Sequence, residues 1–153
     1  MKRTAWRIVK AAHAKIAFNG EGARLYGGRW NSAGIAVVYA SATRALAALE
    51  SLVHLNPPVR FKYVAIAVEF DDSLLESMRA AKLPANWKEQ PAPPSAKAVG
   101  DLWVKEARSA VLELPSVIVP AESNYLLNPA HPDFKSIRVG KPEPFSFDSR
   151  LLG

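Results

Sequence analysis

The sequence FKYVAIAVEF, residues 61–70, is the stretch that most clearly indicates the fold. It alternates along the chain, so that one face of an extended segment would carry Val64, Ile66, Val68 and Phe70. A period of two is the pattern of a β-strand that turns one face towards a core. We therefore expect this segment to lie in a central β-sheet.

The residues before this strand indicate two more strands and a helix. TAWRIVK (4–10) and IAVVYA (35–40) suit strands, and a glycine-rich loop at 18–34 lies between them. Ser41 is a suitable N-cap for a helix that continues to about Leu55 and is closed by the sequence NPP.

The residues after the strand are less regular. In chain order we expect a short helix at 72–81, an irregular proline-rich connection at 83–95, a long helix at 96–113, a buried strand at 116–120, a turn-rich segment at 123–134 and a last strand at 135–140. The tail has no period, and we expect it to pack back through Phe145, Phe147 and Leu151. These elements predict an α+β fold with a mixed central sheet and flanking helices, rather than a doubly wound fold.

Composition limits the classes of protein that remain. The 153 residues suit a single domain, 1–153. The chain has no cysteine, which excludes disulfides and thiolate metal sites and fits a cytoplasmic location. No apolar run is long enough to span a membrane, and Lys10, His13 and Lys15 interrupt the apolar stretch that a signal peptide would need.

The formal net charge is +6, and the early charges are mostly basic. Such an excess suits an anionic partner, whether a phosphate ligand, a nucleic acid or an acidic protein, although a solvated basic surface is the simpler explanation of scattered lysines. The three histidines lack metal-ligand spacing, so we expect no metal site. Fingerprints of nucleotide loops, serine hydrolases and RNA-binding domains are absent from the sequence.

The loop GARLYGGRWNSAG, residues 22–34, places Arg29 and Asn31 directly after a glycine pair. Glycines allow close approach of a ligand to the backbone, and a guanidinium offers a fork of donors to phosphate or carboxylate. A purely structural loop fits the same pattern equally well. Tyr39, at the end of the following strand, is either part of the core or an aromatic platform for a flat ring.

Glu50 is the residue that most strongly suggests catalysis. It lies at the edge of the apolar stripe of the helix expected after Ser41, and His54, rather than a lysine or arginine, follows one turn later. A lone carboxylate near a basic loop would stabilise the cationic transition state of a reaction at a glycosidic bond. The alternative is a solvated residue at the boundary of the core.

Several segments, in order, resemble the RES-domain family. They are WRI (6–8), GEGARLYGGRWN (20–31), VVYAS (37–41) and ALAALESLVHL (45–55), followed by LPSVIVPAESNYLLNPAHPDF (114–134) and FSFDSRL (145–151). By motif position, the family's functional residues fall on Arg7, Arg29, Tyr39, Glu50 and Ser116. The segment 71–113 carries no motif that can be matched.

The resemblance implies a fold similar to that of ADP-ribosyltransferase toxins and an enzyme that consumes NAD as its substrate. It implies catalytic roles for Arg29, Tyr39, Glu50 and Ser116, and contacts to NAD from Arg7, Arg29, Tyr39 and Asn31. Cleavage of the nicotinamide–ribose bond would make the chain an NAD phosphorylase, with inorganic phosphate as co-substrate, or a glycohydrolase. A mono-ADP-ribosyltransferase that modifies a cellular protein is the alternative.

The resemblance also implies a setting and a partner. The chain would be the toxin of a type II toxin–antitoxin system, paired with an Xre-type helix-turn-helix antitoxin that carries the DNA-binding function. We expect no membrane association and no direct nucleic-acid binding, and homodimerisation is left open. A lower-ranked alternative is a non-enzymatic protein that binds nucleic acid through its basic face, with an affinity that falls steeply as salt rises.

Overall fold

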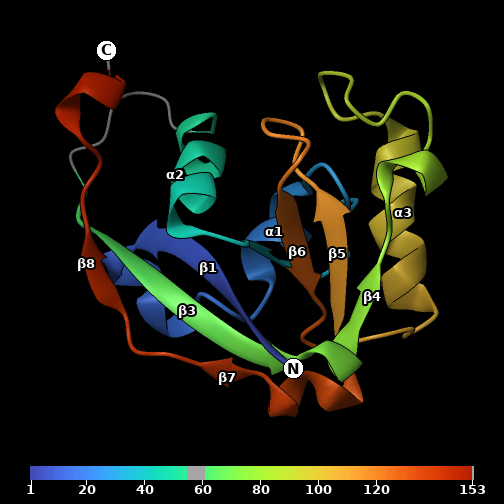
Figure 1. Ribbon diagram of the computed structural model, residues 1–153, viewed down its shortest axis with the longest axis horizontal. Helices are drawn as coiled ribbons and strands as arrows, with labels where there is room; N and C mark the ends of the chain where they lie inside the picture. Colours follow the sequence, from blue (N-terminus) through green and yellow to red (C-terminus); the bar gives the residue numbers. More distant parts are fainter. Residues whose placement is uncertain (55–60, 153) are drawn as a thin grey trace.

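The computed structural model describes residues 1–54 and 61–152, and its centre is one curled, mixed β-sheet (Figure 1). The strand order is β4-β5-β6-β2-β1-β3-β7, and β8 also pairs with β3. Among the described strands β4 and β5 are the parallel pair, and the other pairs are antiparallel. The strands are β1 Lys2–Lys10, β2 Val38–Ser41, β3 Tyr63–Asp71, β4 Leu75–Ser77, β5 Val111–Pro115, β6 Ser123–Leu127, β7 Arg138–Val139 and β8 Glu143–Phe145. The predicted α+β class with a mixed sheet is therefore confirmed.

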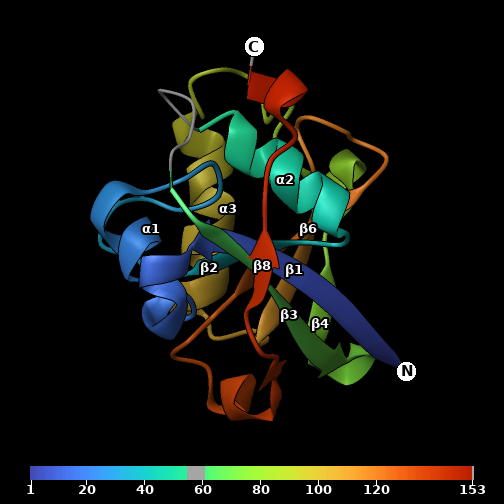
Figure 2. The same ribbon diagram turned by 90° about the vertical axis from the view of Figure 1, so that its left-hand side faces the viewer.

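Three α-helices pack around the sheet: α1 Glu21–Tyr26, α2 Arg44–Leu52 and α3 Pro94–Lys105. In Figures 1 and 2, α2 lies above β1, and α3 lies on the side of the molecule away from β8. Short 3₁₀ helices fill the connections at Ala11–Ile16, Asp72–Leu74, Ala80–Lys82, Pro132–Ser136 and Ser149–Leu152. No helix within the described residues combines the length and apolar character that crossing a membrane requires.

The core consists of two clusters of buried side chains. One surrounds Phe70 and Tyr125 and joins β1 and β3 to β2 and β6. The other contains Trp30, Trp87 and Trp103 and joins α3 and the glycine-rich loop to β5 and β6. Because side chains alternate along a strand, successive residues of β5 and β6 contribute to different clusters.

The expected strand at 61–70 is confirmed as β3. It pairs with β1 over nine residues, from Tyr63 opposite Lys10 to Asp71 opposite Lys2. Ile66, Val68 and Phe70 are all buried, as the alternation predicts. The strand expected at 4–10 is likewise β1, which begins two residues earlier.

Several boundaries in the first half differ from the prediction. The loop expected at 18–34 contains α1, and the strand expected at 35–40 is β2, which begins at Val38. The helix N-cap is Thr43, whose hydroxyl accepts a hydrogen bond from the Leu46 amide, whereas Ser41 is the last residue of β2. The expected end of this helix, at Leu55 and the NPP sequence, lies outside the described residues.

The second half departs further. The helix expected at 72–81 is wrong, because a 3₁₀ turn leads into β4 there. The helix expected at 96–113 ends at Lys105, two residues before Ala107 takes a left-handed conformation with φ 49°. The strand expected at 116–120 is wrong in its bounds, because β5 covers Val111–Pro115 and ends one residue before Ser116. The segment at 123–134, expected to be turn-rich, begins with β6.

The C-terminal tail packs back on the body as expected, but not through all three residues named for it. β8 pairs with β3, and the Phe147 ring makes edge contacts with Tyr63 and Phe145 at centroid distances of 5.3 and 5.0 Å. Leu151 is 54% exposed, so its expected burial is wrong. The strand expected at 135–140 is reduced to the two residues of β7.

Candidate active site

The predicted catalytic residues lie mainly along one edge of the sheet. Glu50 is near the end of α2, Ser116 follows β5, and Arg29 lies in the loop after α1. Figure 1 shows α2, the connection from β5 to β6 and the segment before α3 along its upper edge. Long connections, rather than the strands themselves, therefore supply much of the site.

The Glu50 carboxylate is held by two neutral donors. Its Oε1 accepts a hydrogen bond from Ser116 Oγ at 3.1 Å, and its Oε2 accepts one from Asn124 Nδ2 at 3.1 Å. No lysine, arginine or histidine in the described part of the chain forms an ion pair with it. The carboxylate is thus fixed in orientation without a cationic partner among the described side chains.

Ser116 is fully buried and acts as a donor towards Glu50. Its Oγ accepts hydrogen bonds from the amides of Ile118 and Val119, both at 3.1 Å. Because these amides occupy the acceptor positions of the hydroxyl, its proton points to Glu50. This geometry fits an orienting role better than that of a nucleophile, since no base lies beside the hydroxyl except the carboxylate it orients.

Arg29 faces the same region from the glycine-rich loop. Its Nη1 donates to the carbonyls of Trp87 and Glu89, both at 2.9 Å. Burial lowers the pKa of Arg29, and the negative charge of Glu50 acts against that shift, which places the two groups within electrostatic reach. Within the described residues, Nε and Nη2 have no hydrogen-bond partner and are available to an anion.

Helix α3 and the segment before it fix the Arg29 loop. The rings of Trp30 and Trp87 stack with centroids 6.0 Å apart, and Lys97 Nζ donates to the Gly28 carbonyl at 2.7 Å. At Gly100 the helix backbone approaches so closely that an added Cβ would lie 1.9 Å from the Trp30 carbonyl oxygen. This gives part of the segment 71–113, where the sequence shows no motif, a structural role.

The Tyr39 hydroxyl is committed to this loop. It donates to Asn31 Oδ1 at 2.6 Å and accepts from the Trp30 amide at 3.0 Å. Burial raises the pKa of Tyr39, so the phenol stays neutral. Gly28 packs against the ring, where an added Cβ would lie 2.5 Å from the hydroxyl oxygen. Tyr39 can therefore offer a ligand its ring but not a free hydroxyl.

Two predicted NAD contacts have other partners in the structure. The side chain of Asn31 is fully buried, and its Nδ2 donates to the carbonyls of Ala23, Ser32 and Ile35. Arg7 donates to the carbonyls of Ala17 and Tyr39, at 2.8 and 3.0 Å. Burial lowers the pKa of Arg7 to about 10, so it stays charged at neutral pH. Asn31 organises the loop, and Arg7 bridges β1 and β2 where they separate beyond the Trp6–Ser41 pair.

Asn124 and Ser41 are site residues that the sequence-based prediction missed. Both are buried, and Ser41 Oγ donates to Asn124 Oδ1 at 2.7 Å. The serine and asparagine of SNYLL suggest turns, which conceals Asn124, although the tyrosine and leucines of the same segment favour a strand. A polar residue within such a strand is the signal that would have identified it.

Comparison with solved structures defines the class of fold. A chain in the crystal structure of the M. tuberculosis MbcT–MbcA toxin–antitoxin complex matches with a TM-score of 0.70. The match covers 95% of this chain and 85% of that chain, at 15% sequence identity. The arrangement of the sheet and helices is thus shared at the level of the fold.

Sequence comparison identifies the family. The RES domain matches residues 4–148, and the chain belongs to the RES-domain family. It is similar to the Prs ADP-ribosylating toxin of Sphingobium sp. (strain YBL2), with 40% identity over 99% of this chain and 98% of the relative. It is also similar to Toxin Res of Yersinia enterocolitica, with 36% identity over 95% of this chain and 97% of the relative.

Proposed function

We propose that this chain is the toxin of a toxin–antitoxin pair and that it cleaves the bond between nicotinamide and ribose in NAD. The observation that carries the proposal is the Glu50 carboxylate, oriented by Ser116 and Asn124 and within electrostatic reach of Arg29. Full-length relatives named as toxins support the biological role.

Glu50 would stabilise the reacting ribose. When the glycosidic bond breaks, positive charge develops on the ribose and nicotinamide leaves as a neutral molecule, so no general acid is needed. A fixed carboxylate accepts a hydrogen bond from a ribose hydroxyl and favours the cationic transition state. Because its two donors already hold it in place, little reorganisation is required as the charge develops.

Arg29 and Tyr39 would bind the rest of the dinucleotide. The free donors of Arg29 suit the pyrophosphate or a ribose hydroxyl, and its charge complements an anion. The Tyr39 ring would stack on nicotinamide, while its hydroxyl keeps the loop in place. Arg7 would act through the strand it supports, by holding the Tyr39 backbone.

The acceptor of ADP-ribose separates the two candidate activities. Transfer to inorganic phosphate or water would make the chain an NAD phosphorylase or glycohydrolase. Transfer to a protein side chain is favoured by the Sphingobium relative, which is named an ADP-ribosylating toxin. Bond cleavage and the role of Glu50 are common to both.

An antitoxin would be the protein partner. The fold of this chain is shared with a chain of a toxin–antitoxin complex, and the family resemblance implies an Xre-type helix-turn-helix protein. Co-purification of this chain with the product of a neighbouring gene, and relief of growth arrest by that product, would test the pairing. Harmless overexpression of this chain alone would count against a toxin.

The enzymatic proposal is tested by incubating the purified full chain with NAD, with and without phosphate or cell extract. Mass spectrometry should detect nicotinamide together with ADP-ribose, its 1″-phosphate or ADP-ribosylated protein. Glu50→Gln should lower the rate by about 10²-fold or more, and because its amide nitrogen would face a hydrogen-bond donor, a melting curve must show that the variant is folded at the assay temperature. Intact NAD under every condition would refute the proposal.

A further inference from the structure

A buried amide adjoins the Glu50 carboxylate. Asn124 is 9% exposed and belongs to β6, where it pairs in register with Ser41 of β2. Its Oδ1 accepts the hydrogen bond from Ser41 Oγ at 2.7 Å, and its Nδ2 donates to Glu50 Oε2 at 3.1 Å. Because the Ser41 hydroxyl engages the amide oxygen, the amide nitrogen is turned towards Glu50.

We propose that Asn124, oriented by Ser41, is a positioning residue that holds the Glu50 side chain aimed at the substrate. This inference rests on the proposed function. Nδ2 of Asn124 is a donor only, and the acceptor positions of Ser116 Oγ are occupied by two amides. Both partners can therefore only donate to Glu50, and each of them fixes one of its two side-chain oxygens.

The elements that carry the site residues also carry other charged groups, of which Arg29 is within electrostatic reach of Glu50. Arg29 lies in the loop after α1, His54 follows one turn after Glu50, and the exposed side chains of Glu89 and Glu122 belong to the connections before α3 and β6. Within the described residues, the side chains of Asn124 and Ser41 form hydrogen bonds with each other and with Glu50, and none with these charged groups. Substitutions at positions 41 and 124 thus change the neighbours of Glu50 without removing these charges.

Asn124→Asp is the direct test, because it places a second carboxylate against Glu50 at nearly unchanged volume. Two adjacent carboxylates share one proton, so the acid limb of the pH–rate profile should move up by about one pH unit or more. On the acid limb we therefore expect kcat at a given pH to fall by about 10-fold with a smaller change in KM, and to recover as pH rises towards neutral. Ser41→Ala, which frees the amide to rotate, should shift the limb less in the same direction.

Asn128→Asp is the matched control. Asn128 follows the far end of β6, is 2% exposed and accepts a hydrogen bond from the Ala130 amide, which an aspartate can also do. The Asn128→Asp variant makes the same change of amide to carboxylate away from Glu50, and the acid limb of its pH–rate profile should match that of the wild type. An acid limb in Asn124→Asp that also matches the wild type would overturn the proposal. If Asn124→Asp fails to fold, as judged by its melting curve, the Ser41→Ala profile decides.

A second readout does not depend on turnover. The Glu50 carboxyl carbon can be followed by NMR during a pH titration of the wild type, Asn124→Asp and Asn128→Asp. An upward move of the titration midpoint in Asn124→Asp alone supports the positioning role even if NAD is not the substrate. Cleavage of NAD by the wild type with an unmoved midpoint would refute the positioning role and leave the proposed function standing.

Discussion

Two glutamates lie against opposite faces of the paired strands β5 and β6, and they differ in the partners that hold them. Glu113 lies opposite Tyr125 in register, and the neighbouring pair is Leu114 and Asn124. Since side chains alternate, Tyr125 and Asn124 project to opposite faces. On the Asn124 face the carboxylate is Glu50, contributed by α2, and on the other face it is Glu113.

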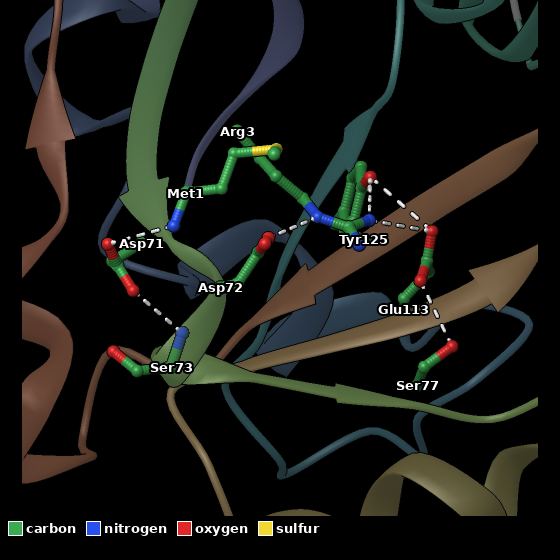
Figure 3. A network of polar contacts seen from close by, with 8 residues as sticks. All are labelled: Met1, Arg3, Asp71, Asp72, Ser73, Ser77, Glu113 and Tyr125. Carbon is green, nitrogen blue, oxygen red and sulfur yellow. Dashed lines mark hydrogen bonds and ion pairs between the residues drawn. The ribbon is translucent and has the colours of Figure 1, made fainter.

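The two carboxylates differ in the charge of their partners. Glu113 forms an ion pair with Arg3 at 3.3 Å and accepts hydrogen bonds from Ser77 and Tyr125 (Figure 3). Hydrogen bonds to Tyr125 and Asp72 raise the pKa of Arg3, so the cation is always present. A carboxylate neutralised in this way ties strands together, whereas one held by neutral donors retains its charge for chemistry.

The largest expected effect separates the two glutamates by kinetics. Glu50→Gln should lower nicotinamide release by about 10²-fold or more, while Glu113→Gln should leave kcat within a factor of about two. Glu113→Gln should instead cost about 1 kcal/mol of unfolding free energy, because its partners are partly exposed. Nicotinamide-release assays and denaturant unfolding of both variants would measure the two effects. Equal losses of activity in the two variants would contradict different roles for Glu50 and Glu113.

A second prediction concerns the support of the Asn124 face. Gly100→Ala should lower the unfolding free energy by about 3 kcal/mol or more, because the new Cβ collides with the Trp30 carbonyl. Gly22→Ala is the control, since no atom lies within 4 Å of its added Cβ, and it should stabilise α1 by about 0.5 kcal/mol. Equal denaturation midpoints for the two variants would contradict the tight contact.

Arginines on the two faces provide a third comparison. Arg29→Ala should raise KM for NAD and lower kcat/KM by about 10- to 100-fold, because it removes a cation from the ligand and two bonds from the loop. Arg3→Ala should leave kcat/KM nearly unchanged and reduce stability. Steady-state kinetics would show the difference, and an unchanged KM in Arg29→Ala would argue against contact with NAD.

The smallest expected effect comes from the tyrosines. Tyr39→Phe leaves Asn31 Oδ1 and the Trp30 amide without their hydrogen bonds to the phenol and should lower the unfolding free energy by about 2 kcal/mol. Tyr125→Phe loses only the long hydrogen bonds to Arg3 and Glu113, at 3.4 and 3.5 Å, and should lower it by less than about 1 kcal/mol. Burial raises the pKa of both phenols above the ordinary value.

The pH dependence of stability gives these tyrosines a further test. The folded chain holds the phenol protons more tightly than the unfolded chain does. The contribution of the protonated phenols to the unfolding free energy is therefore fully present below about pH 10 and declines as pH rises further. Tyr39→Phe should flatten that decline in melts recorded at alkaline pH. An unchanged slope would show that Tyr39 is not the group responsible.

The sequence predicted the sheet best where one face repeats along a long strand. The alternation in β3 identifies it directly, because burial of one face imposes the period. β6 was missed since Asn124 and Asn128 look like turn residues, although both are buried by tertiary contacts that local propensity does not encode. The strand at Val111–Pro115 was absorbed into a helix because a short apolar run fits both periods.

The sequence singles out the side chains of the candidate site but not their hydrogen-bond partners. Glu50 and Arg29 stand out because a carboxylate at the edge of an apolar stripe and an arginine after two glycines are unusual patterns. Their partners come from residues 58 to 74 positions away in the chain, including Trp87, Ser116 and Asn124. Such contacts depend on how the strands assemble, which spacing within one segment does not report.

The most direct test is a crystal structure of the Glu50→Gln variant with NAD, since this variant should bind the dinucleotide without consuming it. We expect the nicotinamide ribose within hydrogen-bonding distance of the side chain at position 50 and an NAD phosphate or ribose oxygen beside Arg29. NAD bound instead in the surface hollow lined by Lys2, Ser73 and Arg138, next to the opposite network, would contradict the proposed site.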